Sequence, residues 1–140
     1  MTGNESGRVS VFLAIALTGL LAIIGVTVDA AGQLRTLLHA DNLAAEAARA
    51  AGQAVDTGQV RRGDELAVVH AQAVDYAARY LAAAGRDLPG GDWSVRPGAT
   101  PGTVEIEVRL TYRTVILRLF GIPEREVTAN ATAVLVTDPA

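Results

Sequence analysis

The chain has 140 residues and no cysteine, so it has no disulfide, no thiolate chemistry and no cysteine-bound metal. Its twelve basic side chains are all arginines, and the largest local group is the pair Arg61 and Arg62. Fifteen carboxylates bring the net charge to −3. Because a nucleic-acid surface needs a basic patch, nucleic acid is not an expected partner.

Catalytic side chains are also scarce. The chain has two histidines, His39 and His70, and neither has a carboxylate or a second histidine four residues later. The serines are Ser6, Ser10 and Ser94. This inventory lacks both a nucleophile–base pair and a metal-binding cluster. We therefore expect no catalytic residue, no metal and no cofactor, and a function other than catalysis.

Charge is missing altogether from the run Val9–Val28, where Ser10, Thr18 and Thr27 are the only polar residues. A helix of about 20 apolar residues crosses a hydrocarbon core ~30 Å thick. Its valine, leucine, isoleucine and phenylalanine residues favour insertion by several kcal/mol in total, on the order of −0.3 to −0.6 kcal/mol each. The run therefore predicts a transmembrane helix over residues 9–28.

Two other interpretations of this run are weaker. A signal peptide has a basic start, an apolar stretch of roughly 7 to 15 residues and an A-x-A-like cleavage site. Here Arg8 stands alone, the run is longer, and Val28, Asp29 and Ala30 make a poor site. A buried core helix seldom contains so long an uncharged run in a small domain. A small secreted binding module, released by signal peptidase, remains the alternative function.

Small residues recur every three or four positions through the predicted span and just beyond it. This spacing places them on one helix face and allows another helix to approach closely, although small residues are common in membrane helices in any case. Asp29 is expected to mark the water interface, because a charge placed deeper costs several kcal/mol. The possible packing stripe consists of Ala14, Thr18, Ala22, Gly25, Asp29 and Gly32.

An alanine-rich sequence follows the span and predicts that the helix continues over about residues 29–57, with a second helix over about 64–85. Polar residues at helical spacing predict a solvated stripe on the first of these helices. Its packing face is expected to consist of Leu34, Leu37, Leu38, Ala45, Ala48 and Val55.

Three charged residues on this helix are candidates for contacting a partner. Asp41 lies close to the leucine and alanine face, which suggests a salt link to another chain or to an arginine. Glu46 and Arg49 are spaced for an ion pair within the helix.

The carboxyl-terminal part predicts a three-stranded antiparallel sheet over about residues 92–137. Strands are expected over 93–96, 103–113 and 126–137, and residues 103–113 alternate strictly between apolar and polar. Glu105 and Glu107 share a strand face with Arg109, which indicates a solvated surface. The segment Val115–Pro123 is too apolar for a solvated loop and must dock on the core, a partner or the membrane. These elements predict an α+β, pilin-like fold.

Two segments carry a resemblance to a known family. They are Gly7–Asp29, which reads GRVSVF at its start and GVTVD at its end, and Leu38–Gly52, which reads LHADNLAAEAARAAG. They resemble the amino-terminal module of TadE/TadG-like pilus-assembly proteins. The likeness covers roughly the first 56 residues. It implies a single-pass protein of the cytoplasmic (inner) membrane that belongs to a Tad (Flp) type pilus or secretion apparatus.

The resemblance also bears on processing. In the family's minor pilins, cleavage follows a glycine before the apolar segment, and a glutamate stands five residues later. Gly7 is the corresponding possible prepilin cleavage site, but Phe12 stands where the glutamate would be. The chain is therefore more similar to the uncleaved TadG-like type, and a cleaved minor pilin is the alternative.

These expectations divide the chain into three regions. Residues 1–8 are a cytoplasmic amino terminus, 9–28 the membrane span, and 29–140 an extracytoplasmic domain. The resemblance implies that the chain acts through helix–helix and domain contacts. Expected partners are other envelope proteins of the apparatus, membrane lipid and a second copy of the chain.

Overall fold

The computed structural model describes residues 5–56, 66–85 and 90–135. The described elements are the helices α1 (Glu5–Asp56) and α2 (Leu66–Ala84), the strand β1 (Asp92–Pro97), the strand β2 (Thr103–Arg113), the 3₁₀ helix η3 (Leu117–Phe120) and the strand β3 (Glu124–Val134). A long apolar amino-terminal helix, a second helix and a three-stranded antiparallel sheet confirm the predicted α+β class.

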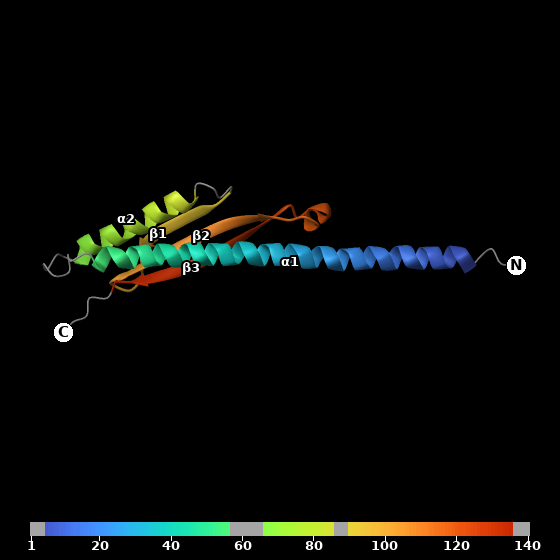
Figure 1. Ribbon diagram of the computed structural model, residues 1–140, viewed down its shortest axis with the longest axis horizontal. Helices are drawn as coiled ribbons and strands as arrows, with labels where there is room; N and C mark the ends of the chain where they lie inside the picture. The colour runs from blue at the N-terminus through green and yellow to red at the C-terminus, as the bar shows by residue number, and fades with distance from the viewer. Residues whose placement is uncertain (1–4, 57–65, 86–89, 136–140) are drawn as a thin grey trace.

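Helix α1 runs through the predicted span and the alanine-rich sequence without a break. Its 52 residues contain no proline, and at a rise of 1.5 Å per residue they extend over ~78 Å. The amino-terminal part projects alone beyond the rest of the molecule (Figure 1). Thr57, Asp64 and Glu65, which belong to the predicted helix ends, lie outside the described residues.

The sheet is an antiparallel meander in the order β1-β2-β3. In the central strand Ile106 pairs with Val95 on one side and with Ala131 on the other. The bounds of β2 coincide with the predicted 103–113, while β3 begins two residues before the predicted start, at Glu124. The predicted end of that strand, residues 136 and 137, lies outside the described residues.

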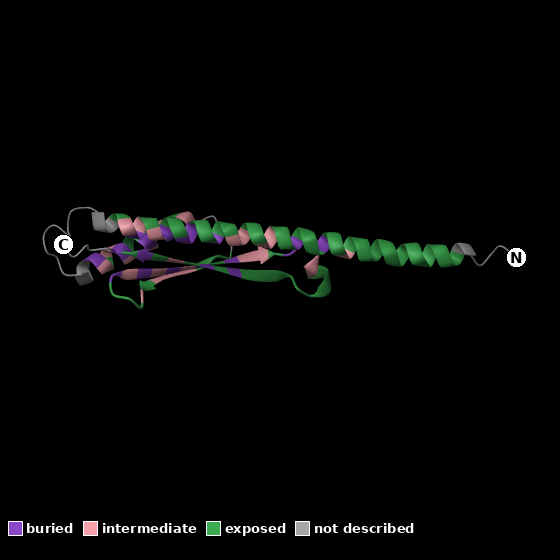
Figure 2. Ribbon diagram, turned by 90° about the horizontal axis from the view of Figure 1, so that it is seen from below, coloured by how far each residue is buried: buried purple, intermediate pink, exposed green. Residues whose placement is uncertain are grey.

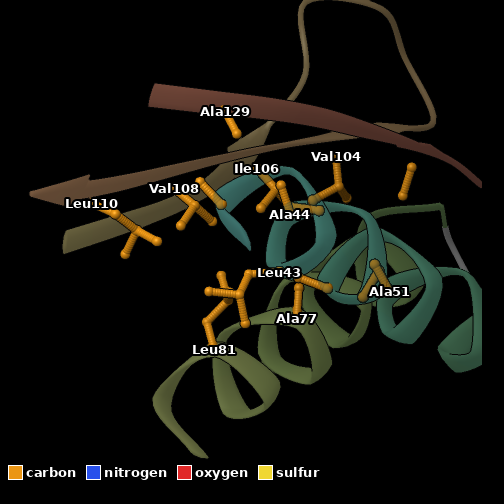
Figure 3. Packing of buried hydrophobic residues seen from close by; sticks show 14 of the residues in the cluster. Leu43, Ala44, Ala51, Ala77, Leu81, Val104, Ile106, Val108, Leu110 and Ala129 are labelled. Atoms are coloured by element: carbon orange, nitrogen blue, oxygen red, sulfur yellow. The ribbon is translucent and has the colours of Figure 1, made fainter. Parts of the chain in front are cut away.

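The core lies between the two helices and one face of the sheet (Figure 3). Alanines dominate the helix side, which lets α1 and α2 approach closely, while valine, isoleucine and leucine make up most of the sheet side. Its buried members include Ala40, Leu43, Ala44, Ala47 and Ala51 of α1, Val69, Ala73, Ala77 and Leu81 of α2, and Val104, Ile106, Val108 and Leu110 of β2.

The predicted packing face of α1 is correct in part, since Leu37 and Ala48 pack against the core, while the side chain of Val55 lies outside the described residues. Leu34 and Leu38 remain 56% and 53% exposed, and Ala45 is exposed as well. The face that packs is the alanine ridge around Ala44, which is fully buried. The physical reason is that α1 touches both α2 and the sheet, and small side chains fit that narrow junction better than leucines do.

Burial divides α1 into two parts (Figure 2). From Gly7 to about Leu21 every residue is exposed, although nearly all are apolar. This segment is long and apolar enough to cross a membrane. The second part of the same helix is packed into the domain.

Candidate functional site

The most unusual feature of the domain is the apolar loop between β2 and β3, which we call the tip (Thr114–Pro123). Thr114 closes its neck, since its N–H donates to the carbonyl of Pro123 at 3.0 Å and its Oγ1 donates to the carbonyl of Ile122 at 2.5 Å. Gly121 ends η3 with a positive φ of 84°, which glycine adopts without strain. The tip is thus a folded unit and not an open loop.

Asp29 of α1 holds the tip. The N–H of Val115 donates to its Oδ1 at 2.6 Å, and those of Ile116 and Leu117 donate to its Oδ2 at 2.9 and 2.7 Å. The hydroxyl of Tyr112 donates to Oδ1 at 3.1 Å. The carboxylate therefore caps the start of η3, in place of a cap from the neighbouring sequence.

The carboxylate of Asp29 is only 1% exposed. The side chain is thus held inside the domain, and the position of Asp29 at the water interface of the membrane stays a prediction. Burial raises the pKa of Asp29, but the N–H groups of residues 115–117 and the Tyr112 hydroxyl outweigh burial, so the pKa lies below its ordinary value. Burial and the neighbouring carboxylate both raise the pKa of Tyr112. Both pKa shifts favour an ionised Asp29 beside a protonated Tyr112.

Two glycines of the predicted stripe let the tip and the end of β2 approach α1. A Cβ added at Gly25 would lie 2.9 Å from the Cβ of Ile116, and one added at Gly32 would lie 2.5 Å from Cε2 of Tyr112. The carboxyl-terminal half of the stripe, which includes Asp29 between these glycines, thus contacts its own chain. Contact of the other half, Ala14, Thr18 and Ala22, with a second helix stays a prediction.

The outer surface of the tip is apolar. Leu119 is 75% and Phe120 69% exposed, and Val115 and Ile122 are exposed to a smaller degree. An apolar groove separates the tip from α1 and is lined by Thr18, Leu21, Gly25 and Val28 on the helix side. Figure 1 shows the tip extending along α1 toward the amino-terminal segment.

The predicted partner residues on α1 lie apart from the tip. Glu46 and Arg49 form the predicted i,i+3 ion pair at 3.7 Å, and both are exposed. Asp41 is exposed, and no ion pair of Asp41 occurs within residues 5–56, 66–85 and 90–135. Gly7 lies in the first turns of α1 with open space around its Cα.

Groups with catalytic potential serve the fold. His70 Nε2 donates to the carbonyl of Thr103 at 2.7 Å, which ties α2 to the start of β2. Glu107 forms an ion pair with Arg109 on the solvated sheet face, as the pattern indicated. In the part of the chain that the structure describes, no three histidine or acidic side chains come together as a metal site.

The contact between Asp29 and the tip was missed at the sequence level. Its bonded partners stand 83 to 88 residues later in the chain, so no local spacing reveals it. The available signal was twofold: an apolar loop whose N–H groups need acceptors, and a single carboxylate at the end of the span.

No protein-family model matches this chain, and no curated protein or solved structure matches it either.

Proposed function

We propose that this chain is a single-pass membrane protein that holds a small α+β domain at one face of the membrane. The observation that carries the proposal is the continuity of α1. One helix has an exposed apolar half and a half packed into the domain. Because no hinge is present between Glu5 and Asp56, the domain has a fixed position relative to the bilayer.

The polar groups in the span also suit a membrane. Thr18 Oγ1 donates to the carbonyl of Ala14 at 2.8 Å, and Thr27 Oγ1 donates to that of Ile23 at 2.9 Å. Hydroxyls that are satisfied by their own helix cost little in hydrocarbon.

Retention of the anchor is also favoured over the secreted alternative. Cleavage after Ala30 would remove Asp29 and leave the N–H groups of Val115, Ile116 and Leu117 without their acceptor. Each buried N–H without a partner costs about 1–3 kcal/mol. Cleavage after Gly7, as in a minor pilin, would leave this contact intact.

We further propose that the protein is a non-enzymatic component of a Tad (Flp) type pilus or secretion apparatus in the cytoplasmic (inner) membrane, with its domain outside the cytoplasm. The support is the resemblance of Gly7–Asp29 and Leu38–Gly52 to the TadE/TadG-like module, together with the long helix and small antiparallel sheet that a pilin-like fold is expected to have. Phe12 favours the uncleaved type. Such a protein acts through contacts with other envelope proteins.

Alkaline extraction of membranes, with amino-terminal sequencing of the protein, tests the anchor. We expect an uncleaved chain in the membrane pellet. A soluble protein that begins near Ala31 would show the secreted module, and a membrane protein that begins at Arg8 would show the cleaved pilin. Alkaline phosphatase fused after Ala140 tests the orientation, because this reporter is active only outside the cytoplasm.

A further inference from the structure

The position of the tip beside the membrane helix suggests that the tip has a ligand of its own. We propose that the tip enters the hydrocarbon of the leaflet on the domain's side, so that lipid acyl chains cover Leu119 and Phe120. This inference rests on the proposed function in one respect, namely that α1 spans a membrane.

The position of the tip along α1 places it beside the predicted membrane span. Val115, Ile116, Leu119 and Phe120 line one groove with helix residues from Thr18 to Val28. Ten helical residues rise ~15 Å, which is half of a hydrocarbon core ~30 Å thick. If residues 9–28 fill that core, the tip lies at the depth of one leaflet.

The exposed surface of the tip is apolar and adjoins the apolar surface of α1. Its exposed apolar side chains continue the exposed apolar surface of α1, where Leu21 and Ile24 stand beside the groove. Contiguous apolar surface at the edge of a membrane span is a surface for lipid. The tip and the helix thus present one continuous face to the acyl chains.

Most backbone N–H groups of the tip have hydrogen-bond acceptors within the protein. Irregular backbone enters hydrocarbon only if its polar groups have partners inside the protein. Asp29 accepts from Val115, Ile116 and Leu117, and carbonyls of the tip accept from Thr114, Leu119, Gly121 and Ile122. Pro123 has no N–H to satisfy. Asp29 and these carbonyls thus give internal acceptors to seven of the nine N–H groups of the tip, as entry into lipid favours.

One charged residue, Arg118, lies within the tip and is exposed. A long arginine side chain near a membrane surface extends its guanidinium to the phosphate groups while its methylenes stay among the acyl chains. Arg118 is therefore compatible with shallow insertion.

Site-directed spin labelling tests the proposal, and the absence of native cysteine makes single labels straightforward. Full-length Phe120→Cys, Leu13→Cys and Ala99→Cys are labelled and reconstituted into phosphatidylethanolamine–phosphatidylglycerol vesicles. Leu13 reports the span, and Ala99 reports the exposed β1–β2 hairpin at the far end of the domain. Collision rates with oxygen and with a water-soluble nickel chelate give the depth of each label.

We expect the label at Phe120 to resemble that at Leu13, with high oxygen and low nickel accessibility, and the label at Ala99 to show the reverse. A Phe120 label that matches Ala99 while Leu13 lies in lipid overturns the tip proposal alone. A water-accessible Leu13 overturns the anchor, and the tip proposal with it. Leu119→Cys provides a second tip site, and circular dichroism of each labelled protein verifies that it is folded.

Discussion

At the scale of single residues, Asp29 and Tyr112 determine how the tip is held. The two side chains meet at 3.1 Å, and the ring of Tyr112 also lies against Gly32. A buried carboxylate is stable only when several donors surround it, and here three N–H groups and one hydroxyl do so.

Tyr112→Phe is predicted to weaken this contact without changing its shape. The ring still fits over Gly32, but Asp29 loses one of its four donors. We expect the thermal midpoint of the detergent-solubilised protein to fall by about 5 °C, the effect of one hydrogen bond in a domain of this size. Tyr76→Phe is the matched control, because Tyr76 is half exposed on α2. Equal midpoints for the two variants would contradict the prediction.

The lowered pKa of Asp29 predicts that the attachment of the tip to α1 depends on pH. Because this pKa is below its ordinary value of about 3.9, the contact is fully stabilising above that value and is lost as the pH falls through the lower pKa of the folded state. A spin label at Leu119 should therefore become more mobile once the pH falls below about 4. In Asp29→Asn the label should already be mobile at pH 7, since a neutral amide offers one acceptor oxygen. If the Leu119 label is equally mobile at pH 7 with aspartate and with asparagine at position 29, Asp29 does not hold the tip.

At the scale of elements, several features follow from local sequence. Strand β2 was predicted with its bounds because apolar and polar residues alternate over its whole length, from Thr103 to Arg113. The continuity of α1 was predicted from the alanine-rich sequence that follows the span, because alanine strongly favours helix. Features of this kind can be predicted because the residues that determine them all lie within the element itself.

Other features of the elements were not predictable in this way. The predicted packing face of α1 included Leu34 and Leu38, which are exposed, because alanine and leucine occur nearly all around that helix and leave its amphipathic pattern weak. The choice of the alanine ridge depends on α2 and the sheet together. The role of Asp29 depends on a loop far along the chain. Such tertiary contacts leave no periodic trace in the sequence.

Gly25→Ala is predicted to displace the tip from α1. The new Cβ would lie 2.9 Å from the branched Cβ of Ile116, which no rotamer of that side chain relieves. Overpacking of this kind costs about 1–3 kcal/mol. We expect a Leu119 spin label to gain mobility in this variant.

Gly19→Ala is the matched control for this prediction. It lies in the same apolar half of α1, where an added Cβ meets no atom within 4 Å. Both substitutions bring the same gain in helix propensity, so their difference isolates the contact with Ile116. Identical mobility in the two variants would show that the tip does not pack on Gly25.

At the scale of the whole molecule, α1 joins three surfaces along one rod. Its first half is apolar and exposed, its middle holds the tip, and its second half forms the core with α2 and the sheet. The exposed side of that second half carries Leu34, Leu38 and Asp41 at four- and three-residue spacing, so the three share one stripe. Exposed leucines in line on a rigid helix are typical of a surface that binds a partner helix.

Under the proposed function, the paired variant Leu34→Gln, Leu38→Gln is predicted to bind envelope partners less well. Exposed positions tolerate such changes within about 0.5 kcal/mol, so the fold should remain. Two leucines buried at an interface contribute about 1.5–3 kcal/mol each, so recovery of cross-linked partners should fall at least about tenfold. Val134→Gln on β3 is the control, since Val134 is also well exposed. If recovery is unchanged but falls with Ala14→Leu, the partners bind the amino-terminal half of the stripe within the membrane, and the leucines have no part in the contact.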